Sequence, residues 1–354
     1  MLRTLLAAIL VAVPLEAQEA GKVPVPDKTD AALARAVAFL VGTQAADGSI
    51  VQAGQNQNQT AMTSLAILAM AAVGHQPTDD TREGKAMKKA LAFVLKPERQ
   101  NPQGYLGEKD GSRMYGHGIV TLMLAEMLGM GVDAQQDQAL RDRCRKAVDL
   151  ILKSQALKKD ARGAGGWRYQ PESMDSDLSV TVWQVMALRS ARNAGLDVPK
   201  ESIERALEYI KRCYYVSKEK EGDRLKSGCG YEPGRRPEYA MAAAGLLSLA
   251  VCGDYESAEV KGSAEWLKEQ KPDFTREWFF YGTYYYAQGM FQRGGEHAAH
   301  ARKTVEEILL PKQGADGAWT AQHPQERDAG KVYSTSLGIL CLAVKFHFLP
   351  IYQR

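Results

Sequence analysis

A repeated helical segment limits what this chain of 354 residues can fold into more than any other feature does. Residues 36–44, 147–155 and 264–270 each begin with Ala, continue with helix-forming residues and end with Gln, and residues 305–313 end with Gln in the same way. A polar loop and a second, more apolar helical segment follow each copy. We expect six of these second helices, which begin near Thr60, Tyr115, Asp177, Glu238, Trp278 and Tyr333.

The two helices of each pair differ in composition. The first carries charges along one face, as in residues 201–211, whereas the second is apolar on all sides, as in residues 61–70 and 240–250. Amphipathic helices belong at the surface, and helices that are apolar all round belong in the interior. No window alternates polar and apolar residues with a period of two over a useful length, which excludes a β-rich fold. The pattern predicts an all-α fold, an (α/α)6 toroid made of two concentric rings of six helices.

The loops between paired helices carry a motif of their own. Residues 313–319 read Gln-Gly-Ala-Asp-Gly-Ala-Trp, residues 44–50 repeat this pattern with Ile50 in the Trp position, and residues 165–169 give a third copy. The spacing Gln-x3-Gly-x-Trp resembles the repeat of squalene and oxidosqualene cyclases. The chain is therefore similar to the terpenoid cyclase and protein prenyltransferase superfamily over nearly its whole length. We interpret the motif as structural, because Gly permits a tight turn and Gln and Trp can hydrogen-bond neighbouring helix pairs.

The first residues have the features of an export signal. Residues 1–17 combine a short positive start, an apolar run and a plausible cleavage position after Ala17, which is typical of a secretory signal peptide. The apolar run is shorter than the roughly 20 residues that a bilayer span requires. We expect residues 18–30 to form a linker and residues 31–354 to form the toroid of six helix-pair repeats. The predicted location is secreted or periplasmic.

Charge and cysteine content narrow the range of partners. Lys and Arg (45) nearly balance Asp and Glu (42) and are spread along the chain, so the sequence predicts no nucleic-acid partner. No later apolar stretch is long enough to span a membrane. The five cysteines are scattered and never spaced as CxxC, unlike those of a disulfide framework or a zinc knuckle. Cys213 and Cys229 flank one loop, and whether they pair stays open.

The resemblance to protein prenyltransferases raises the question of a catalytic metal. Those enzymes hold zinc with an Asp, a Cys and a His at the starts of inner helices. In the matching segments of this chain, Tyr281 stands in the Asp position, Thr283 in the Cys position and Ser334 in the His position. Tyr, Thr and Ser do not replace that ligand set for zinc. We therefore predict no metal and no cofactor, so that any catalysis would proceed without metal.

The resemblance to squalene-hopene-type cyclases points to an acid instead. Those enzymes protonate an alkene with an Asp of a DxDD motif at an inner-helix start. Residues 175–178 resemble this motif, with Asp175 in the first position, Asp177 in the position of the proton donor and Leu178 in place of the last Asp. Such chemistry requires a proton made unusually acidic in a dry pocket. The alternative is that Asp175 and Asp177 only cap the following helix, where acidic residues are favoured.

Aromatic residues are concentrated in residues 278–286, where an inner helix should open toward one mouth of the toroid. Aromatic faces stabilise cations and also bind polyisoprene or sugar rings, although plain core packing would use the same residues. Arg235 and Arg236, beside a helix start, could bind an anion. The candidate catalytic residues are thus Asp177 and Asp175. The candidate ligand-binding residues are Trp183, Tyr239, Trp278, Tyr281, Tyr284, Tyr285, Tyr333, Arg235, Arg236 and His117.

Two classes of function are compatible with these residues. In the first, an exported toroid with an aromatic-lined cavity takes an apolar, isoprenoid-like small molecule, and Asp177 starts cyclase or isomerase chemistry. In the second, the toroid is a non-catalytic binding or scaffold protein whose partner is a small molecule or an extracytoplasmic protein. A glycan-processing enzyme is a third hypothesis, which rests on fold analogy alone.

Overall fold

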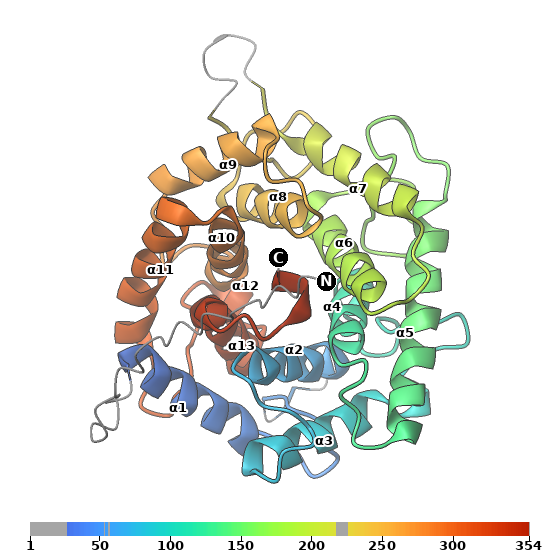
Figure 1. The fold of residues 1–354 in the computed structure, drawn as a ribbon, viewed down its shortest axis with the longest axis vertical. Helices are drawn as coiled ribbons and strands as arrows, with labels where there is room; N and C mark the ends of the chain where they lie inside the picture. Colours follow the sequence, from blue (N-terminus) through green and yellow to red (C-terminus); the bar gives the residue numbers. More distant parts are fainter. Residues whose placement is uncertain (1–26, 53, 56, 217–225, 354) are drawn as a thin grey trace, which may run out of the picture.

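The computed structural model describes residues 27–216, apart from residues 53 and 56, and residues 226–353. These described residues form helices and isolated β-bridges but no β-strand. Figure 1 shows two concentric rings of helices, which confirms the predicted all-α toroid. The outer ring consists of α1 (Lys28–Gly42), α3 (Arg82–Val94), α5 (Ala134–Gln155), α7 (Lys200–Cys213), α9 (Ala258–Glu269) and α11 (Gly295–Leu309). The inner ring consists of α2 (Gln59–Ala72), α4 (Arg113–Glu126), α6 (Leu178–Asn193), α8 (Tyr239–Val251), α10 (Phe279–Arg293) and α13 (Gly330–Leu342).

The inner helices begin close to the positions that the sequence predicts. Asp177, Glu238 and Trp278 are the N-cap residues of α6, α8 and α10. The first outer helix, α1, begins at Lys28. It therefore includes residues 28–30, the last part of the stretch 18–30 that the sequence predicts to be a linker. The predicted signal peptide lies outside the described residues. Short elements complete the fold: α12 (Pro324–Arg327), η1 (Pro97–Arg99), η3 (Leu310–Lys312), η4 (Ala343–Lys345) and η5 (Pro350–Tyr352).

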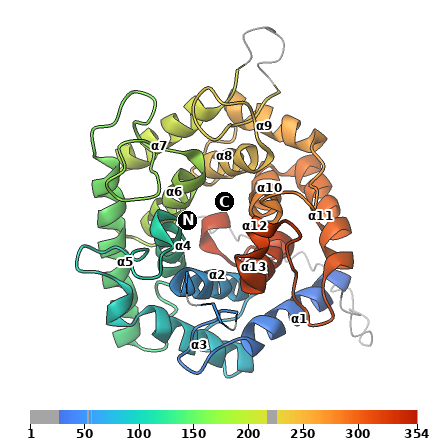
Figure 2. The same ribbon diagram turned by 180° about the vertical axis from the view of Figure 1, so that it is seen from behind.

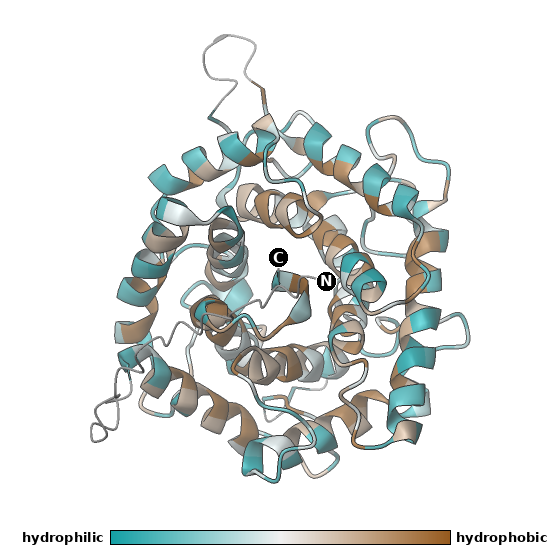
Figure 3. Ribbon diagram, in the orientation of Figure 1, coloured by the Kyte–Doolittle hydropathy of each residue, from teal (hydrophilic) through white to brown (hydrophobic). Residues whose placement is uncertain are grey.

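Hydropathy follows the division into two rings: Figure 3 shows mostly hydrophobic inner helices and outer helices that carry many hydrophilic residues. In the inner helix α8, every residue from Met241 to Val251 is buried. None of the helices in the described part of the chain combines the length and the hydropathy of a membrane span. The outer helix α7 buries only one face, at spacings of three and four residues that match the helical period. The buried residues of α7 are Ser202, Ile203, Ala206, Tyr209, Ile210 and Cys213.

The repeated Gln residues tie neighbouring outer segments together. The side-chain amide of Gln313 donates to the Gly317 carbonyl oxygen of its own loop and to a carbonyl oxygen on α1, both at 2.8 Å. Gln44, Gln100 and Gln155 each make the same pair of bonds, one to their own loop and one to the next outer helix. Because Gln313 reaches α1, the last copy closes the ring between the final and the first repeat.

The loop glycines are needed because a backbone approaches them closely. Gly317 has a φ of +84°, and a Cβ atom there would lie 2.4 Å from the carbonyl oxygen of Arg35 on α1. Gly48, Gly104 and Gly165 have positive φ as well, and each would bring a Cβ atom within 2.5 Å of the carbonyl oxygen of the next outer helix. Only glycine fits such a contact. The motif therefore has the structural role that the sequence indicates.

The two ends of the inner ring differ. All inner helices begin at one end, and residues 343–353 fold back into the other end, so that Figures 1 and 2 show the last residues inside the ring. Leu349, Ile351 and Tyr352 of this segment are buried. Four of the five cysteines are buried and Cys252 is partly buried, and all five are free thiols, including Cys213 and Cys229.

Candidate functional site

A cavity of about 550 Å³ opens at the end of the inner ring where the inner helices begin, and we call it the mouth cavity. All six inner helices or their N-cap residues contribute to its wall. Aliphatic side chains such as Met62, Leu65 and Leu337 form part of this wall. Most of the remaining large side chains are aromatic: Tyr115, Tyr169, Trp183, Tyr231, Trp278, Tyr281 and Tyr333.

Strained backbone is concentrated at this cavity. Asn58, Arg113 and Trp278 have φ values of 59°, 55° and 56°, in the left-handed region that non-glycine residues rarely adopt. Each of the three begins or caps an inner helix, and each lines the mouth cavity. Such strain persists where the surrounding structure enforces it, and it clusters at binding sites. Trp278 is also 43% exposed, which is unusual for so large an apolar residue.

Ser179, at the start of α6, organises the tyrosines of the wall. The hydroxyls of Tyr115 and Ser179 share a hydrogen bond, and the Tyr281 hydroxyl donates to the Ser179 carbonyl oxygen at 2.9 Å. The hydroxyls of Tyr169 and Tyr231 form a second pair. Burial raises the pKa of Tyr115 and Tyr281 well above the ordinary value for tyrosine, so both stay neutral. The wall is therefore an uncharged aromatic surface at this position.

Asp177 lies behind this wall rather than in it. Its Oδ1 accepts a hydrogen bond from the Val180 N–H at 2.9 Å and another from the Ser179 hydroxyl at 2.6 Å, the geometry of an N-cap. Its Oδ2 makes no hydrogen bond, and the nearest cation, Arg168, has its Nε 3.7 Å away. Burial raises the pKa of Asp177, although the bonds from Ser179 and Val180 lower it. Asp177 is thus a helix cap, and its pKa is raised because its carboxyl group is buried.

Asp175 lies outside the mouth cavity. Its side chain is mostly exposed and pairs with Arg168 Nη1 at 2.9 Å. It lines a separate polar groove that also contains Glu232 and Arg235. Asp175 and Asp177 therefore face different surroundings, with Arg168 between them.

Two buried acids that the sequence analysis did not single out cap other inner helices. Glu326, on α12, accepts hydrogen bonds from the N–H groups of Phe280 (3.1 Å) and Tyr281 (2.9 Å) at the start of α10. Asp110 accepts bonds from two N–H groups at the start of α2, at 3.1 and 3.2 Å. Among the described residues of the wall, Glu238 is the one carboxylate, and its pKa is raised by burial and by Glu277.

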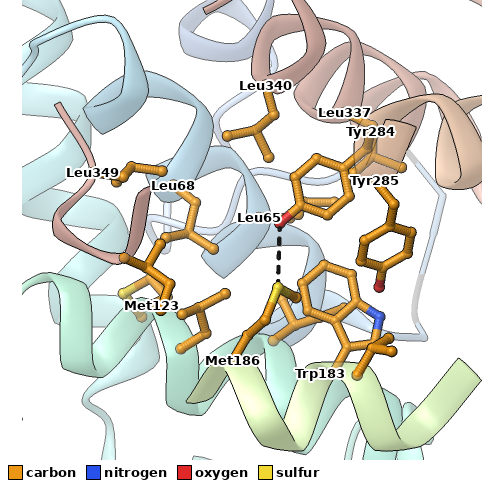
Figure 4. Close-up of a cluster of buried hydrophobic side chains, with 14 of the residues drawn as sticks. Leu65, Leu68, Met123, Trp183, Met186, Tyr284, Tyr285, Leu337, Leu340 and Leu349 are labelled. Carbon is orange, nitrogen blue, oxygen red and sulfur yellow. Dashed lines mark hydrogen bonds between the residues drawn. The ribbon is translucent and has the colours of Figure 1, made fainter. Parts of the chain in front are cut away.

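Four of the predicted ligand-binding residues lie in the wall of the mouth cavity, namely Trp183, Trp278, Tyr281 and Tyr333. Tyr284 and Tyr285 do not line this cavity and lie beside Trp183, as Figure 4 shows. The Tyr284 ring stacks on the Trp183 indole with 5.7 Å between ring centroids, and Tyr285 packs edge-on against the same indole. These two tyrosines support the floor of the cavity rather than line it.

The other predicted ligand-binding residues face away from the cavity. His117 is fully buried, where its Nδ1 accepts from the Leu106 N–H and its Nε2 lies 3.1 Å from a carbonyl oxygen of α5. Tyr239 packs against Tyr286 instead. The reason is helical rotation, because a residue in the first turn of an inner helix can equally face the outer ring. Arg235 lines the polar groove, and Arg236 is exposed outside the mouth cavity.

The residues at the positions that match the zinc ligands of prenyltransferases are buried or bonded to the protein backbone. Thr283 is buried, and the Ser334 hydroxyl donates to the Trp319 carbonyl oxygen at 2.7 Å. Within the described residues, the potential ligand atoms that lie close together belong to Glu265, Glu296 and His297, which are on the outer helices α9 and α11. That cluster is remote from the mouth cavity.

Residues 25–159 and 167–350 match the family of the prenyltransferase alpha-alpha toroid domain. The match covers most of the chain, so the protein belongs to this family. No curated protein sequence is a significant match to the chain.

Solved structures share the fold at low sequence identity. An inactive variant of the alpha-1,6-mannanase GH76A of Salegentibacter sp. HEL1_6 has a TM-score of 0.64 at 9% identity, covering 90% of this chain and 99% of that one. The type II terpene cyclase MstE from Scytonema has a TM-score of 0.57 at 14% identity, covering 89% and 98%. A possible GH105 family member from Salmonella enterica has a TM-score of 0.57 at 12% identity, covering 95% and 99%. These likenesses establish the toroid architecture.

Proposed function

We propose that the protein is an exported toroid that binds an apolar, isoprenoid-like small molecule in the mouth cavity. The composition of the wall carries this proposal: all six inner helices converge on one cavity, and they supply aromatic and aliphatic side chains with Glu238 as the one carboxylate among the described residues. The strained Trp278 and Arg113 at the rim support it. An apolar surface of this kind recognises its ligand by shape and by contact with aromatic faces.

The size of the cavity suits a modest affinity. Each 100 Å² of apolar ligand surface removed from water is worth about 2.5 kcal/mol. A ligand that buries about 400 Å² gains roughly 10 kcal/mol, from which the loss of translational and rotational freedom is subtracted. The expected dissociation constant is on the order of tens of micromolar or weaker.

Acid-initiated cyclase or isomerase chemistry is the second candidate. The observation that favours it is the line of hydrogen bonds from Asp177 through Ser179 to Tyr115, which connects a buried acid with the cavity wall. Polysaccharide cleavage has less support, because it requires a pair of carboxyl groups on either side of the bond. The wall offers Glu238 alone among the described residues.

Export is part of the proposal and rests on residues 1–17, which lie outside the described residues. Fractionation of cells that express the full chain tests it, together with N-terminal sequencing of the recovered protein. We expect protein outside the cytoplasm that begins after residue 17. Full-length protein confined to the cytoplasm would contradict export without touching the binding proposal.

Binding can be tested with farnesol as the apolar probe, because Trp183 and Trp278 report on the cavity through their fluorescence. Ala240 is partly exposed in the cavity wall, so Ala240→Phe places a ring where the ligand would lie. The matched control is Ala299→Phe, on the outer face of α11. We expect at least tenfold weaker binding for Ala240→Phe and unchanged binding for the control. Equal binding by both variants, or native mass spectra that show only a bound glycan, would refute the proposal.

A further inference from the structure

The end of the inner ring opposite the mouth cavity is closed by residues 346–353, which we call the plug (Figures 1 and 2). An inner helix such as α6, with 16 residues, is about 24 Å long and separates the two ends. The plug buries Leu349, Ile351 and Tyr352, while His347 and Phe348 are exposed. The plug therefore does not line the mouth cavity.

Polar contacts attach the plug to two inner helices, α10 and α4. Gln292 of α10 donates to the Tyr352 carbonyl oxygen at 2.6 Å, and the hydroxyls of Tyr284 and Tyr352 share a hydrogen bond. The Ile351 N–H donates to Oε2 of Glu126, the last residue of α4, at 3.2 Å. The other oxygen of Glu126 accepts from a hydroxyl on α6. Glu126 thus bridges two inner helices and the plug.

Glu126 is an unusual residue for such a position because it is an acid with 2% of its surface exposed. No ion pair to Glu126 exists among the described residues, where its partners are the Ser190 hydroxyl and the Ile351 N–H. The titratable groups that face it are Tyr284 of α10 and Tyr352 of the plug, and burial keeps the pKa of both above the ordinary tyrosine value. Burial also raises the pKa of Glu126 to about 7, although its two hydrogen bonds lower it.

The direction of the pH effect follows from the two environments of this acid. A protonated Glu126 is neutral and suits the buried site, where its hydroxyl can donate to Ser190. An ionised Glu126 without a cation nearby is disfavoured there and favoured in water. If the plug leaves the ring, Glu126 meets solvent and its pKa returns toward about 4.3. Between these two pKa values, each rise of one pH unit shifts the balance about tenfold toward the open form.

We propose that Glu126 is a pH-sensitive latch, which holds the plug in the ring at acidic pH and loosens it as the pH rises, so that the second end of the toroid opens. The device regulates access to the interior from the end opposite the mouth cavity. It uses a buried acid that the proposed binding function leaves without a role.

Hydrogen exchange of the plug amides, measured by mass spectrometry on the full chain, tests the latch. The wild type and Glu126→Gln are compared at the same pH, so that the intrinsic exchange rate cancels. Gln can accept from the Ile351 N–H with its oxygen and donate to the Ser190 hydroxyl with its amide nitrogen, as a protonated Glu would, but it does not ionise. We expect the ratio of wild-type exchange to Glu126→Gln exchange to rise at least tenfold from pH 5 to pH 8. A ratio that stays the same from pH 5 to pH 8 would overturn the proposal.

Two control variants assign the effect to Glu126. His347 is the titratable side chain exposed on the plug itself, and His347→Asn removes it while tolerating the left-handed φ of 55°. Glu326→Gln removes another buried acid, at the opposite end of the ring. Both variants should keep the pH dependence of the wild type, and its loss in His347→Asn would overturn the proposal. If Glu126→Gln does not fold, the test uses the wild type alone, as the ratio of hydrogen exchange in the plug to that in α2. A ratio that does not change with pH would exclude the latch.

Discussion

Replacing Asp177 by Asn and by Ala distinguishes its role as a helix cap from its possible role as a catalytic acid. Asn keeps an oxygen that can accept from the Val180 N–H and the Ser179 hydroxyl, whereas Ala loses both bonds. Loss of an N-cap costs about 1 kcal/mol, and a buried hydroxyl without its acceptor adds about 1 kcal/mol. We therefore expect Asp177→Ala to reduce the free energy of unfolding by about 2 kcal/mol and Asp177→Asn by less than about 1 kcal/mol.

The pH dependence of this difference is also fixed by the structure. Because burial raises the pKa of Asp177 above its unfolded value of about 3.9, ionisation weakens the folded state as the pH rises through the folded pKa. Asn carries no charge and escapes this penalty. The free energy of unfolding of Asp177→Asn, relative to that of the wild type, should therefore be higher at pH 7 than at pH 4.

Thermal unfolding followed by circular dichroism measures these effects. For a chain of this length, about 2 kcal/mol corresponds to a decrease in Tm of about 3 °C. Farnesol binding should be unchanged in Asp177→Asn, because Asp177 does not line the mouth cavity. A decrease in Tm as large for Asn as for Ala would refute the cap argument and show that the carboxylate itself is required. Loss of turnover with normal binding, once a substrate is known, would instead establish the acid.

Three further predictions concern the ring and its core. Gln313→Ala should lower the free energy of unfolding by about 1–2 kcal/mol in denaturant titrations, whereas Gln270→Ala, whose amide bonds only its own helix at 3.3 Å, should cost less than about 0.5 kcal/mol. Gly317→Ala should lower Tm more than Gly129→Ala, because both have positive φ but only Gly317 touches a neighbouring backbone; equal losses would contradict this. Burial lowers the pKa of His117 to about 4, so stability should fall as the pH drops from about 6.5 to 4, and His117→Gln should flatten this part of the Tm profile.

The architecture could be predicted from the sequence because the loop motif and the two kinds of helix recur in a periodic pattern. The Gln and Gly of each loop motif act within one repeat and on the next, as Gln313 and Gly317 do on α1. Apolar inner helices and amphipathic outer helices differ in composition over whole segments. These features extend over whole segments and do not depend on any single residue. The toroid and the starts of its helices could therefore be predicted to within a few residues.

The site was less predictable because it depends on the rotation of individual helices and on contacts distant in sequence. His117 and Tyr239 lie at inner-helix starts, but their side chains do not line the mouth cavity. Glu326 caps α10 from 46 residues away, and Asp110 caps α2 from 50 residues away. No local pattern marks such pairs, since an acid in a loop gains this role only when the ring brings the helix start beside it.

The need for caps also explains why acids gather at the mouth of the toroid. Inner helices that begin together leave unpaired N–H groups and partial positive charges at one end. Asp177, Asp110 and Glu326 each satisfy one of these helix starts. An acidic motif at this place is therefore a poor indicator of catalysis, since the fold itself selects acids there. The more informative feature is a carboxylate oxygen that the cap does not use, and Oδ2 of Asp177, buried without a hydrogen bond beside Arg168, is such an atom.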